Sequence, residues 1–423
     1  MKKTIQVLKP TYYDKFHCIG GVCEDNCCDR PWKIQIDKKT YLKYRDIKHP
    51  EVRAAVEKSV KRVRDDTAGV HSYAVITQDE AGRCPLHTAE GLCMIHKELG
   101  AEYLCDTCQI YPRLVGRMEG ERVERALNMS CPEAVRVALL DTEPMGFEIV
   151  EEELDGQGFG AAKRINHDLR QSKSGYRLLA WPLREVSIDI MQCREYSVEM
   201  RLFIIGMLMR RVTELGKAGK WQEIADILPT FARGAQSGEF HQMADFPPDD
   251  EMKKQVRYIT CGLLLERAVL QGVVNKIAGR AVTSGLRDAT EEQKSLVDEA
   301  VLESVYARKK AEFWPGFLEK YSHVLENYLV NFFFTRLFPI DVTNVMEPYQ
   351  HFCLVAEQFA FMRSLLCLLS EDGNLDKDTL VLVISSVAVL GENSNEFSLI
   401  NKNVYEKLEV EGLAYMYFTV LDN

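Results

Sequence analysis

Nine of the thirteen cysteines lie between Cys18 and Cys131, in the first third of a 423-residue chain. Such a dense group of thiols indicates disulfides, a metal or iron–sulfur site, or redox chemistry. A chain of this length can bury a large apolar core, so it does not need the disulfides that stabilise small secreted domains. One part of the fold therefore has to bring these thiols together for another purpose.

The chain carries no evident targeting or membrane signal. No apolar run of signal-peptide length precedes Pro10, and no later stretch of about twenty apolar residues predicts a membrane span. We therefore expect a cytoplasmic protein with no membrane partner. Cytoplasmic thiols are kept reduced, which favours a metal site over disulfides.

Charge is distributed unevenly along the chain. The formal net charge is −10, but residues 1–136 hold 23 Lys and Arg against 20 Asp and Glu, whereas the remainder holds 30 against 43. Neither part is basic enough to resemble a nucleic-acid-binding domain, so we expect no nucleic-acid partner. The acidic remainder favours solubility.

Periodicity and turn residues predict a mainly α fold, in which a cysteine-rich domain packs on a multi-helix C-terminal body. We expect a metal or iron–sulfur domain over 1–136, a connector over 137–180 and a helical domain over 181–423. The glycine cluster at 155–160 follows a strongly acidic segment. It is therefore typical of a flexible linker and not of the glycine-rich loop of Rossmann-type methyltransferases.

Individual elements follow from the spacing of apolar residues. In the cysteine-rich domain we expect helices over 38–47 and 50–64 and a short strand over 71–77. The helices expected in the rest of the chain cover 183–217, 221–232, 251–278, 291–337, 349–369, 377–390 and 401–421. Pro315 is expected to break or kink the fourth of these helices.

The cysteines fall into local groups with the spacing of metal ligands. Thiolates about two to four residues apart can bind one ion from a single loop, as in zinc and iron–sulfur sites. The candidate ligands are Cys18, Cys23, Cys27, Cys28, Cys84, Cys93, Cys105 and Cys108. Soft thiolates suit zinc and iron–sulfur clusters alike, so the choice of metal stays open.

The other cysteines and the nearby histidines are weaker candidates. Cys131 precedes Pro132 and suits a ligand or a helix start equally. The four distal cysteines lie in apolar helical patterns and are expected to be buried, inert thiols. They are Cys193, Cys261, Cys353 and Cys367. The nearby histidines, expected to be supporting or surface groups, are His17, His87 and His96.

Several segments of the first third form a wider pattern around these cysteines. They are Phe16-His-Cys18 to Cys28, Trp32-Lys-Ile-Gln-Ile-Asp37, Cys84-Pro-Leu86, Leu92-Cys93 to Gly100, Tyr103-Leu-Cys105 to Arg113 and Leu127-Asn-Met-Ser-Cys131-Pro-Glu-Ala134. Together they resemble the flagellin lysine-N-methylase family. The same cysteine plan is similar to a broader family of zinc- or iron-chelating domains. A second block, Leu325 to Pro339, resembles a helix near the end of those methylases.

The resemblance implies methyl transfer from S-adenosylmethionine to lysine side chains of flagellin, by an enzyme that carries a four-iron four-sulfur (4Fe-4S) cluster. The alternative is a zinc- or iron-binding protein without enzymatic activity, such as a sensor, a metallochaperone or an interaction module. A lysine must lose its proton before it attacks, since its pKa is about 10.4 in model peptides. Direct polar transfer of the methyl group and transfer mediated by the cluster both stay open as mechanisms.

Three further residues are candidate cofactor contacts. Arg113 offers a bidentate fork for a carboxylate, although it equally suits a structural role that caps the cysteine loop. Asn327 and Asn331 lie one turn apart on one face of an apolar helix. Their amides suit a cofactor's carboxylate or ribose, or a hydrogen-bond network between helices.

Overall fold

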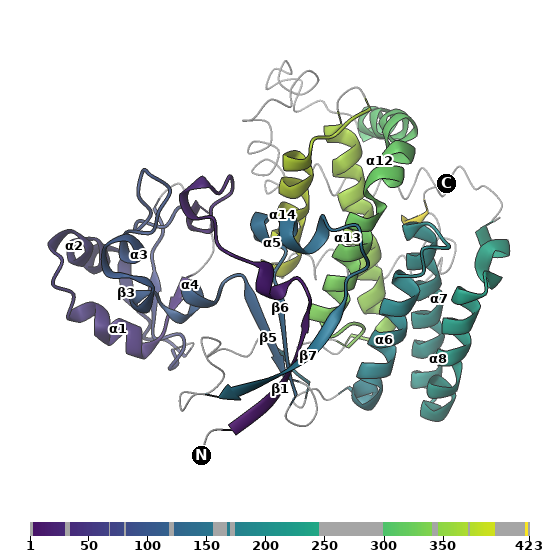
Figure 1. The fold of residues 1–423 in the computed structure, drawn as a ribbon, viewed down its shortest axis with the longest axis horizontal. Coiled ribbons are helices and arrows are strands. Elements are labelled where there is room, and N and C mark those ends of the chain that lie inside the picture. The colour runs from purple at the N-terminus through teal and green to yellow at the C-terminus, as the bar shows by residue number, and fades with distance from the viewer. Residues whose placement is uncertain are drawn as a thin grey trace. The chain divides into compact units, whose positions relative to one another are not determined.

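The computed structural model describes most of the chain. The described residues are 3–29, 34–66, 68–79, 82–117, 122–154, 167–169, 174–244, 299–340, 346–370, 373–393 and 419–421. The chain divides into two compact units, Met1–Val137 with Gly146–Asp168 and Ala138–Met145 with Leu169–Asn423. We call them the N-terminal unit and the C-terminal unit (Figure 1).

The N-terminal unit contains a mixed five-stranded sheet that the sequence does not predict, since the one strand expected there covers 71–77. Its strands are β1 (Lys3–Pro10), β5 (Arg113–Arg117), β6 (Val123–Leu127), β7 (Phe147–Leu154) and β8 (His167–Asp168), in the order β7-β1-β6-β5-β8. β1 pairs parallel with β6 and antiparallel with β7. Ile5, Val7 and Val115 belong to the buried cluster of this sheet. The alternation of Ile5 and Val7 with polar residues is the strand signal that the sequence interpretation missed.

Strand β7 lies inside the segment that the sequence predicts as a connector. It pairs with β1 along its whole length, at the edge of the sheet. Its acidic side chains meet basic partners, because Arg125 Nη2 lies 2.7 Å from Glu152 Oε2 and Lys9 Nζ lies 3.6 Å from Glu148 Oε1. An acidic strand suits an antiparallel edge, although it would not suit the interior of a parallel sheet.

A second, three-stranded antiparallel sheet accompanies two helices. These elements are β2 (Ile34–Ile36), α1 (Lys38–Arg45), α2 (Pro50–Ser59), β3 (Val60–Arg62) and β4 (Ala74–Ile76). Helix α1 and strand β4 confirm the expected first helix and strand. The helix predicted over 50–64 is too long, because the chain continues from Val60 as strand β3 and pairs with β4. The β-branched residues Val60 and Val63 favour this extended backbone.

Short helices connect the cysteine segments. They are α3 (Met94–Leu99), α4 (Asp106–Ile110), α5 (Pro132–Leu139) and the 3-10 turns η1 (Tyr13–Lys15), η2 (Gly20–Val22), η3 (Cys27–Asp29) and η4 (Ala101–Tyr103). Ile36, Tyr44 and Val52 belong to a buried core that also contains Cys84 and Cys105. A packed apolar core therefore anchors part of the cysteine-rich region.

The C-terminal unit is helical, which confirms the mainly α prediction. Its helices are α6 (Ala180–Met191), α7 (Val198–Lys217), α8 (Trp221–Gln236), α12 (Glu299–Thr335), α13 (Pro348–Leu369) and α14 (Lys377–Asn393), with 3-10 turns η6 (Gly175–Leu179) and η7 (Glu239–Ala244). Helix α13 packs against α7, α12 and α14, and α6 packs against α7, α8 and α12. These helices bury the apolar faces that the periodicity indicates.

The single helix predicted over 183–217 is wrong, because the chain forms α6 and α7 there. Helix α6 ends at Met191 and α7 begins after Ser197. The Ser197 hydroxyl accepts a hydrogen bond from the Met200 backbone N–H at 3.2 Å, which is the geometry of a helix N-cap. The turn between the two helices carries Cys193 and Arg194.

Helix α12 passes through Pro315 without a break. The neighbouring side chains of Trp314 and Phe317 are buried, and their rings stack with a centroid separation of 5.0 Å. Burial of two aromatic side chains outweighs the one backbone hydrogen bond that a proline removes.

Some predicted features lie outside the described residues. They are the helix over 251–278, the glycine cluster at 155–160, Cys261 and, apart from 419–421, the helix over 401–421. No structural statement applies to them.

Among the described helices, α13 is long and apolar enough to span a membrane by length and composition alone. Its most apolar window has a mean hydropathy of 1.7, but 83% of that window is buried inside the fold. Packing against three other helices accounts for its apolar character.

Asp376 caps the start of α14. We expect Asp376→Ala to lower the free energy of unfolding by about 1 kcal/mol at neutral pH. Its Oδ1 accepts hydrogen bonds from the backbone N–H groups of Asp378 at 3.0 Å and Thr379 at 2.9 Å. Burial alone would raise the pKa of Asp376, but hydrogen bonds from Thr379 outweigh this and lower it.

The capping contribution is therefore fully present above the unfolded-state pKa of about 3.9 and is lost as the pH falls through the lower folded-state pKa. Urea unfolding at neutral pH and at about pH 3 measures this difference. Asp376→Asn is the matched control, because it keeps the acceptor oxygen without the charge. Equal pH dependence in the native protein and the Asn variant would contradict the assignment.

Candidate functional site

Eight thiols lie near one another in the N-terminal unit, and we call them the cysteine site. They are Cys23, Cys27, Cys28, Cys84, Cys93, Cys105, Cys108 and Cys131. The group contains every predicted ligand except Cys18, which is exposed. It also contains Cys131, which the sequence left equally suited to a ligand and a helix start.

Hydrogen bonds link several of these thiols directly. The Cys28 thiol bonds to those of Cys27 and Cys84, and these contacts together with burial raise its pKa far above the usual value. Cys105 and Cys108 share a hydrogen bond that lowers the pKa of Cys105 and raises that of Cys108. Cys105 is therefore the member of this pair that most readily becomes a thiolate.

Three cysteines of the site stand immediately before a helix. Cys93 precedes α3, Cys105 precedes α4 and Cys131 precedes α5. The backbone N–H groups of the first helical turn act to lower the pKa of each thiol, although Cys93 and Cys105 form no side-chain cap hydrogen bond and burial still raises the pKa of Cys131 to about 12. Free N–H groups and the helix dipole favour a negative sulfur at this position. The arrangement suits thiolate ligands of a metal.

Two cysteine loops approach each other backbone to backbone. The amide of Asn26 donates to the Gly91 carbonyl at 2.9 Å, and the Cys84 N–H donates to the Cys28 carbonyl at 2.8 Å. A side chain at Gly91 would place its Cβ 2.9 Å from the Gly21 carbonyl oxygen, and Gly91 has a φ of +76°. Only glycine fits this contact without strain.

We therefore expect Gly91→Ala to destabilise the N-terminal unit by about 1 to 3 kcal/mol and to weaken metal retention. The matched control is Gly316→Ala in α12, where a new Cβ meets nothing within 4 Å. That change is expected to stabilise its helix by about 0.5 to 1 kcal/mol. Urea unfolding and metal analysis of both variants measure the effects. A Gly91→Ala protein as stable as the native one would contradict the close loop contact.

Helix α4 follows Cys105 and carries Cys108. Residues that do not belong to the cysteine site hold this helix in position. Asp37 caps α1 and also accepts the backbone N–H of Asp106 at 3.3 Å. Thr107 Oγ1 donates to the Gln35 carbonyl at 2.9 Å, which ties the same helix to β2. These contacts hold the position of both thiols before any metal binds.

The histidines differ in their relation to the site. His17 and His96 are exposed. His87 lies inside the loop between Cys84 and Cys93, pairs with Cys93 as an isolated β-bridge and has a buried Nε2 atom. Whether His87 is a supporting group or a ligand stays a prediction, because its backbone pairs with that of Cys93.

The donor chemistry of the site fits a soft metal or an iron–sulfur cluster, because all eight atoms are sulfurs from several segments. No three Cys, His, Asp or Glu side chains in the described parts of the chain converge as ligands of one ion do. The thiols are instead gathered in hydrogen-bonded groups, and none of the described cysteines forms a disulfide. Which of the predicted cysteines bind metal stays a prediction.

The distal cysteines lie elsewhere. Cys353 and Cys367 are buried in α13, in keeping with the expected inert thiols, and burial raises the pKa of Cys353. Cys193 lies in the turn between α6 and α7, where its thiol donates to the Ala235 carbonyl at 3.3 Å.

Arg113, a candidate cofactor contact, lies on β5. Its guanidinium carbon stands 5.1 Å from the centre of the Phe16 ring, in a cation–π contact. Phe16 is two residues before Cys18, so this contact matches the structural alternative, in which Arg113 braces the first cysteine loop. A role in cofactor binding stays a prediction.

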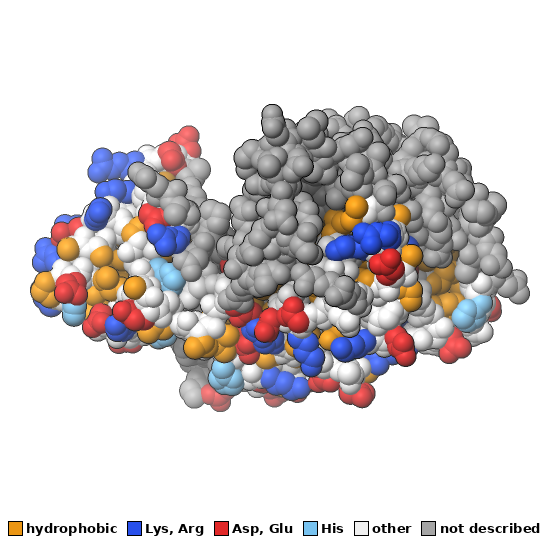
Figure 2. All heavy atoms as spheres, turned by 90° about the horizontal axis from the view of Figure 1, so that it is seen from above, with side chains coloured by type: hydrophobic (Ala, Val, Ile, Leu, Met, Phe, Trp, Pro, Cys, Tyr) orange, Lys and Arg blue, Asp and Glu red, His pale blue; other side chains and the backbone are white. Residues whose placement is uncertain are grey.

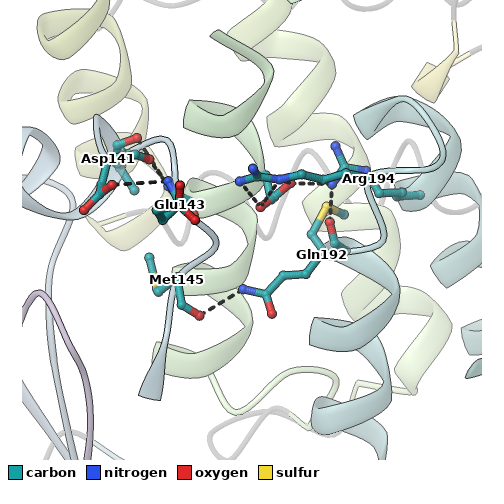
Figure 3. Close-up of polar contacts among 10 residues, drawn as sticks. Asp141, Glu143, Met145, Gln192 and Arg194 are labelled. Carbon is teal, nitrogen blue, oxygen red and sulfur yellow. Dashed lines mark hydrogen bonds and ion pairs between the residues drawn. The ribbon is translucent and has the colours of Figure 1, made fainter. Parts of the chain in front are cut away.

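In the C-terminal unit, a buried ion-pair group surrounds Glu326 of α12. The Glu326 carboxylate accepts hydrogen bonds from Arg194 Nε at 3.0 Å and Nη2 at 2.9 Å, and from the buried Arg201. Arg194, which is labelled in Figure 3, reaches this carboxylate from the turn after α6. From the same turn, the Gln192 amide donates to the Met145 carbonyl at 2.9 Å.

The candidate residue Asn327 lies next to this group. Its side-chain N–H₂ donates to the carbonyls of Leu139 at 3.4 Å and Asp141 at 3.0 Å, so it holds the segment that follows α5. Its Oδ1 atom is buried without a hydrogen-bond partner among the described residues. Asn331 is buried as well. The Asn327 amide therefore takes part in a hydrogen-bond network of the kind expected between helices. Cofactor binding by Asn327 or Asn331 stays a prediction.

His323 stands one turn before Asn327 on α12. Burial and the nearby Arg194 lower its pKa, although Glu326 and Asp141 act in the opposite sense. The imidazole is therefore neutral at neutral pH, and a neutral imidazole can accept a proton. Sequence interpretation missed it because its partners are distant in the chain.

Comparison with known proteins bears directly on the C-terminal unit. A profile described as the FliB lysine N-methylase C-terminal domain matches residues 184–419, more than half of the chain. The chain belongs to the FliB lysine N-methylase family. The match spans the helices from α6 to α14, including Glu326 and both candidate asparagines.

Curated relatives agree with this family. The chain is 32% identical over 143 residues to the lysine-N-methylase of Salmonella typhimurium, which is 34% of this chain and 35% of the relative. It is also 32% identical over 143 residues to the flagellar biosynthetic protein FliU of Salmonella muenchen, covering 82% of that protein. The match thus spans about a third of the lysine-N-methylase. No solved structure matches the chain.

Proposed function

We propose that this protein transfers a methyl group from S-adenosylmethionine to lysine side chains of flagellin, and that its cysteine site holds an iron–sulfur cluster. The observation that carries the proposal is the match of residues 184–419 to the lysine N-methylase C-terminal domain. One relative is the flagellar biosynthetic protein FliU, which supports a flagellar substrate.

The transfer breaks one bond and forms another. The lone pair of the deprotonated lysine nitrogen attacks the methyl carbon of the sulfonium, and the carbon–sulfur bond breaks. S-adenosylhomocysteine leaves as a neutral thioether, and the lysine nitrogen becomes a methylammonium. Because lysine is protonated at neutral pH, an acceptor has to take a proton before attack. We propose His323 as that acceptor, because burial and the nearby Arg194 lower its pKa and keep its imidazole neutral at neutral pH.

The cysteine site would hold the iron–sulfur cluster through thiolates of Cys28, Cys84, Cys105 and Cys108. A bound cluster supplies electron transfer or an electron-poor iron. The chain's own contribution is to bring loops from distant segments together, to hold them on a packed core and to favour thiolates at helix starts.

A second function is favoured by one observation. The matching profile begins at residue 184, so it leaves the cysteine site uncovered. A zinc or iron site that only stabilises the N-terminal unit, or that senses metal or redox state, needs no methyl transfer. Zinc in stoichiometric amount, with no iron or sulfide, would favour this alternative.

Release of S-adenosylhomocysteine tests the proposal. Anaerobically purified protein is incubated with S-adenosylmethionine and either unmodified flagellin or flagellin whose lysines have been acetylated. We expect product only with unmodified flagellin, since an acetylated nitrogen is not nucleophilic. Equal release with both substrates, or no release with either under cluster-replete conditions, would refute lysine methylation of flagellin.

A further inference from the structure

One surface of the N-terminal unit is strongly positive in a chain that is acidic as a whole. Residues 38–64 hold ten Lys and Arg against three Asp and Glu, whereas the formal net charge of the chain is −10. Within this segment, α1 and the stretch 60–64 contain no acidic residue. Figure 2 shows Lys and Arg side chains along one edge of this unit, interspersed with acidic and apolar side chains.

Helix α1 and strand β3 meet at one tyrosine, and we call their cations the α1–β3 basic surface. These cations are Lys38, Lys39, Lys43 and Arg45 of α1, Lys61 and Arg62 of β3, and Arg64 two residues after β3. Lys38 Nζ of α1 lies 5.7 Å from the Tyr73 ring centre, and Arg62 Cζ of β3 lies 4.7 Å from it. The Tyr73 ring therefore brings together one cation of each segment, Lys38 from α1 and Arg62 from β3.

Four exposed cations of this surface have no acidic partner in the described parts of the chain. Lys39, Arg45, Lys61 and Arg64 are exposed and form no ion pair with any described residue. Elsewhere, exposed cations do pair locally, as Arg53 does with Glu57 of α2 at 2.9 Å. Unpaired like charges repel one another, and a polyanion relieves that repulsion.

An apolar residue lies within the same surface. Leu42 of α1 is 47% exposed and stands one helical turn from Lys38, Lys39 and Arg45. An apolar residue within a ring of charges is the usual composition of a protein–protein contact. A surface that bound its partner through charge alone would not need an exposed apolar side chain.

We infer that the α1–β3 basic surface docks an acidic polypeptide segment, and specifically an acidic segment of the substrate protein. This rests on the proposed function. The lysine to be methylated is itself cationic and is repelled here, so docking has to use a different, acidic part of the substrate. A docking contact away from the reacting side chain lowers KM without taking part in the chemistry.

A nucleic acid is the other polyanion that such a surface attracts, but the aromatic rings argue against it. Single-stranded nucleic acids gain much of their affinity by stacking bases on open aromatic faces. Here Lys38 and Arg62 lie over Tyr73, and Lys43 Nζ lies 4.2 Å from the centre of the Tyr103 ring. The cations occupy faces that a base would need.

The test is the affinity of the full-length protein for labelled, unmodified flagellin, measured without S-adenosylmethionine. The variant Lys39→Glu/Lys61→Glu/Arg64→Glu reverses three unpaired charges that make no ring contact. We expect its Kd to rise about tenfold at low salt, and the affinity of the native protein to fall as salt is raised. A labelled DNA duplex is measured in parallel.

The matched control is Lys217→Glu/Lys220→Glu/Arg233→Glu, which makes the same change of net charge on exposed residues of α7 and α8 and the turn between them. We expect its Kd to stay within about twofold of the native value. Thermal unfolding confirms that both variants fold. Equal loss in both variants, no flagellin binding by the native protein, or tighter binding of the duplex would each overturn the inference.

Methylation of a short lysine peptide separates this inference from the proposed function. Such a peptide lacks a docking segment, so both triple variants are expected to methylate it at the native rate. Peptide methylation without salt-sensitive flagellin binding refutes only the docking surface. Flagellin binding without any methyl transfer refutes only the proposed function.

Discussion

Substitution of both cysteines of the Cys105–Cys108 pair by alanine is expected to remove the bound metal. Cys105 precedes α4, Cys108 lies within it, and their thiols share a hydrogen bond. Without these two thiolates, the remaining cysteines cannot complete a four-ligand site around α4. Iron and acid-labile sulfide in anaerobically purified protein should fall by at least about tenfold.

The matched control is Cys353→Ala with Cys367→Ala. Both thiols are buried in α13, in the C-terminal unit. The control removes the same number of sulfur atoms and is expected to retain the metal. Each small cavity is expected to lower the free energy of unfolding by about 1 kcal/mol. Equal metal content in the two double variants would refute the assignment of the cysteine site.

Glu326→Gln is expected to destabilise the C-terminal unit by about 3 to 5 kcal/mol. Glu326 is 1% exposed, and its partner Arg201 is 3% exposed. Removal of the carboxylate charge leaves the Arg201 guanidinium buried without a negative partner, with only the Met191 and Ser197 carbonyls as acceptors among the described residues. The second partner, Arg194, is 42% exposed and can return to water, so it adds less to the cost. Urea unfolding measures the loss as a shift of the transition midpoint.

Glu214→Gln is the control for the loss of a glutamate charge beside two arginines. Glu214 pairs with Arg210 at 3.5 Å and Arg211 at 3.2 Å, and all three side chains are exposed. Water and salt screen these pairs, so we expect a change within about 1 kcal/mol. If Glu326→Gln lost as little stability as Glu214→Gln, the ion pairs of Glu326 would not be desolvated. Glu326→Leu with Arg201→Met should recover part of the stability, because it leaves no unpaired charge.

The grouping of cysteines was accessible from the sequence because ligand spacing is a local property. Cys105 and Cys108, three residues apart, predict one shared site. Whether distant segments join that site depends on packing, which spacing does not encode. Cys131 belongs to the group although only a Cys-Pro at a helix start marked it, and Cys18 is exposed although its spacing matched.

Helices were easier to predict than strands. The apolar period of α13 is continuous over the whole helix, so its bounds follow closely from the sequence. Strand β1 contributes only Ile5 and Val7 to its buried cluster, and its partners β6 and β7 lie more than a hundred residues away. A sheet assembled from such distant segments leaves little local signal in the chain.

Polar site residues illustrate a further limit of sequence interpretation. The period of α12 places Asn327 and Asn331 on one face, and both are indeed buried. The partners of Asn327 are two carbonyls of a segment near residue 140, which no pattern in α12 identifies. Burial was predictable from periodicity, whereas the bonding partner was not.

The central claim is that this chain methylates lysine side chains of flagellin. The most direct test incubates the cluster-replete protein with S-adenosylmethionine labelled in its methyl group and with unmodified flagellin, then hydrolyses the flagellin and identifies the labelled amino acid. The account predicts label in N-methylated lysine and none in the other amino acids. Unlabelled flagellin, from protein that retains its iron and sulfide, would contradict it.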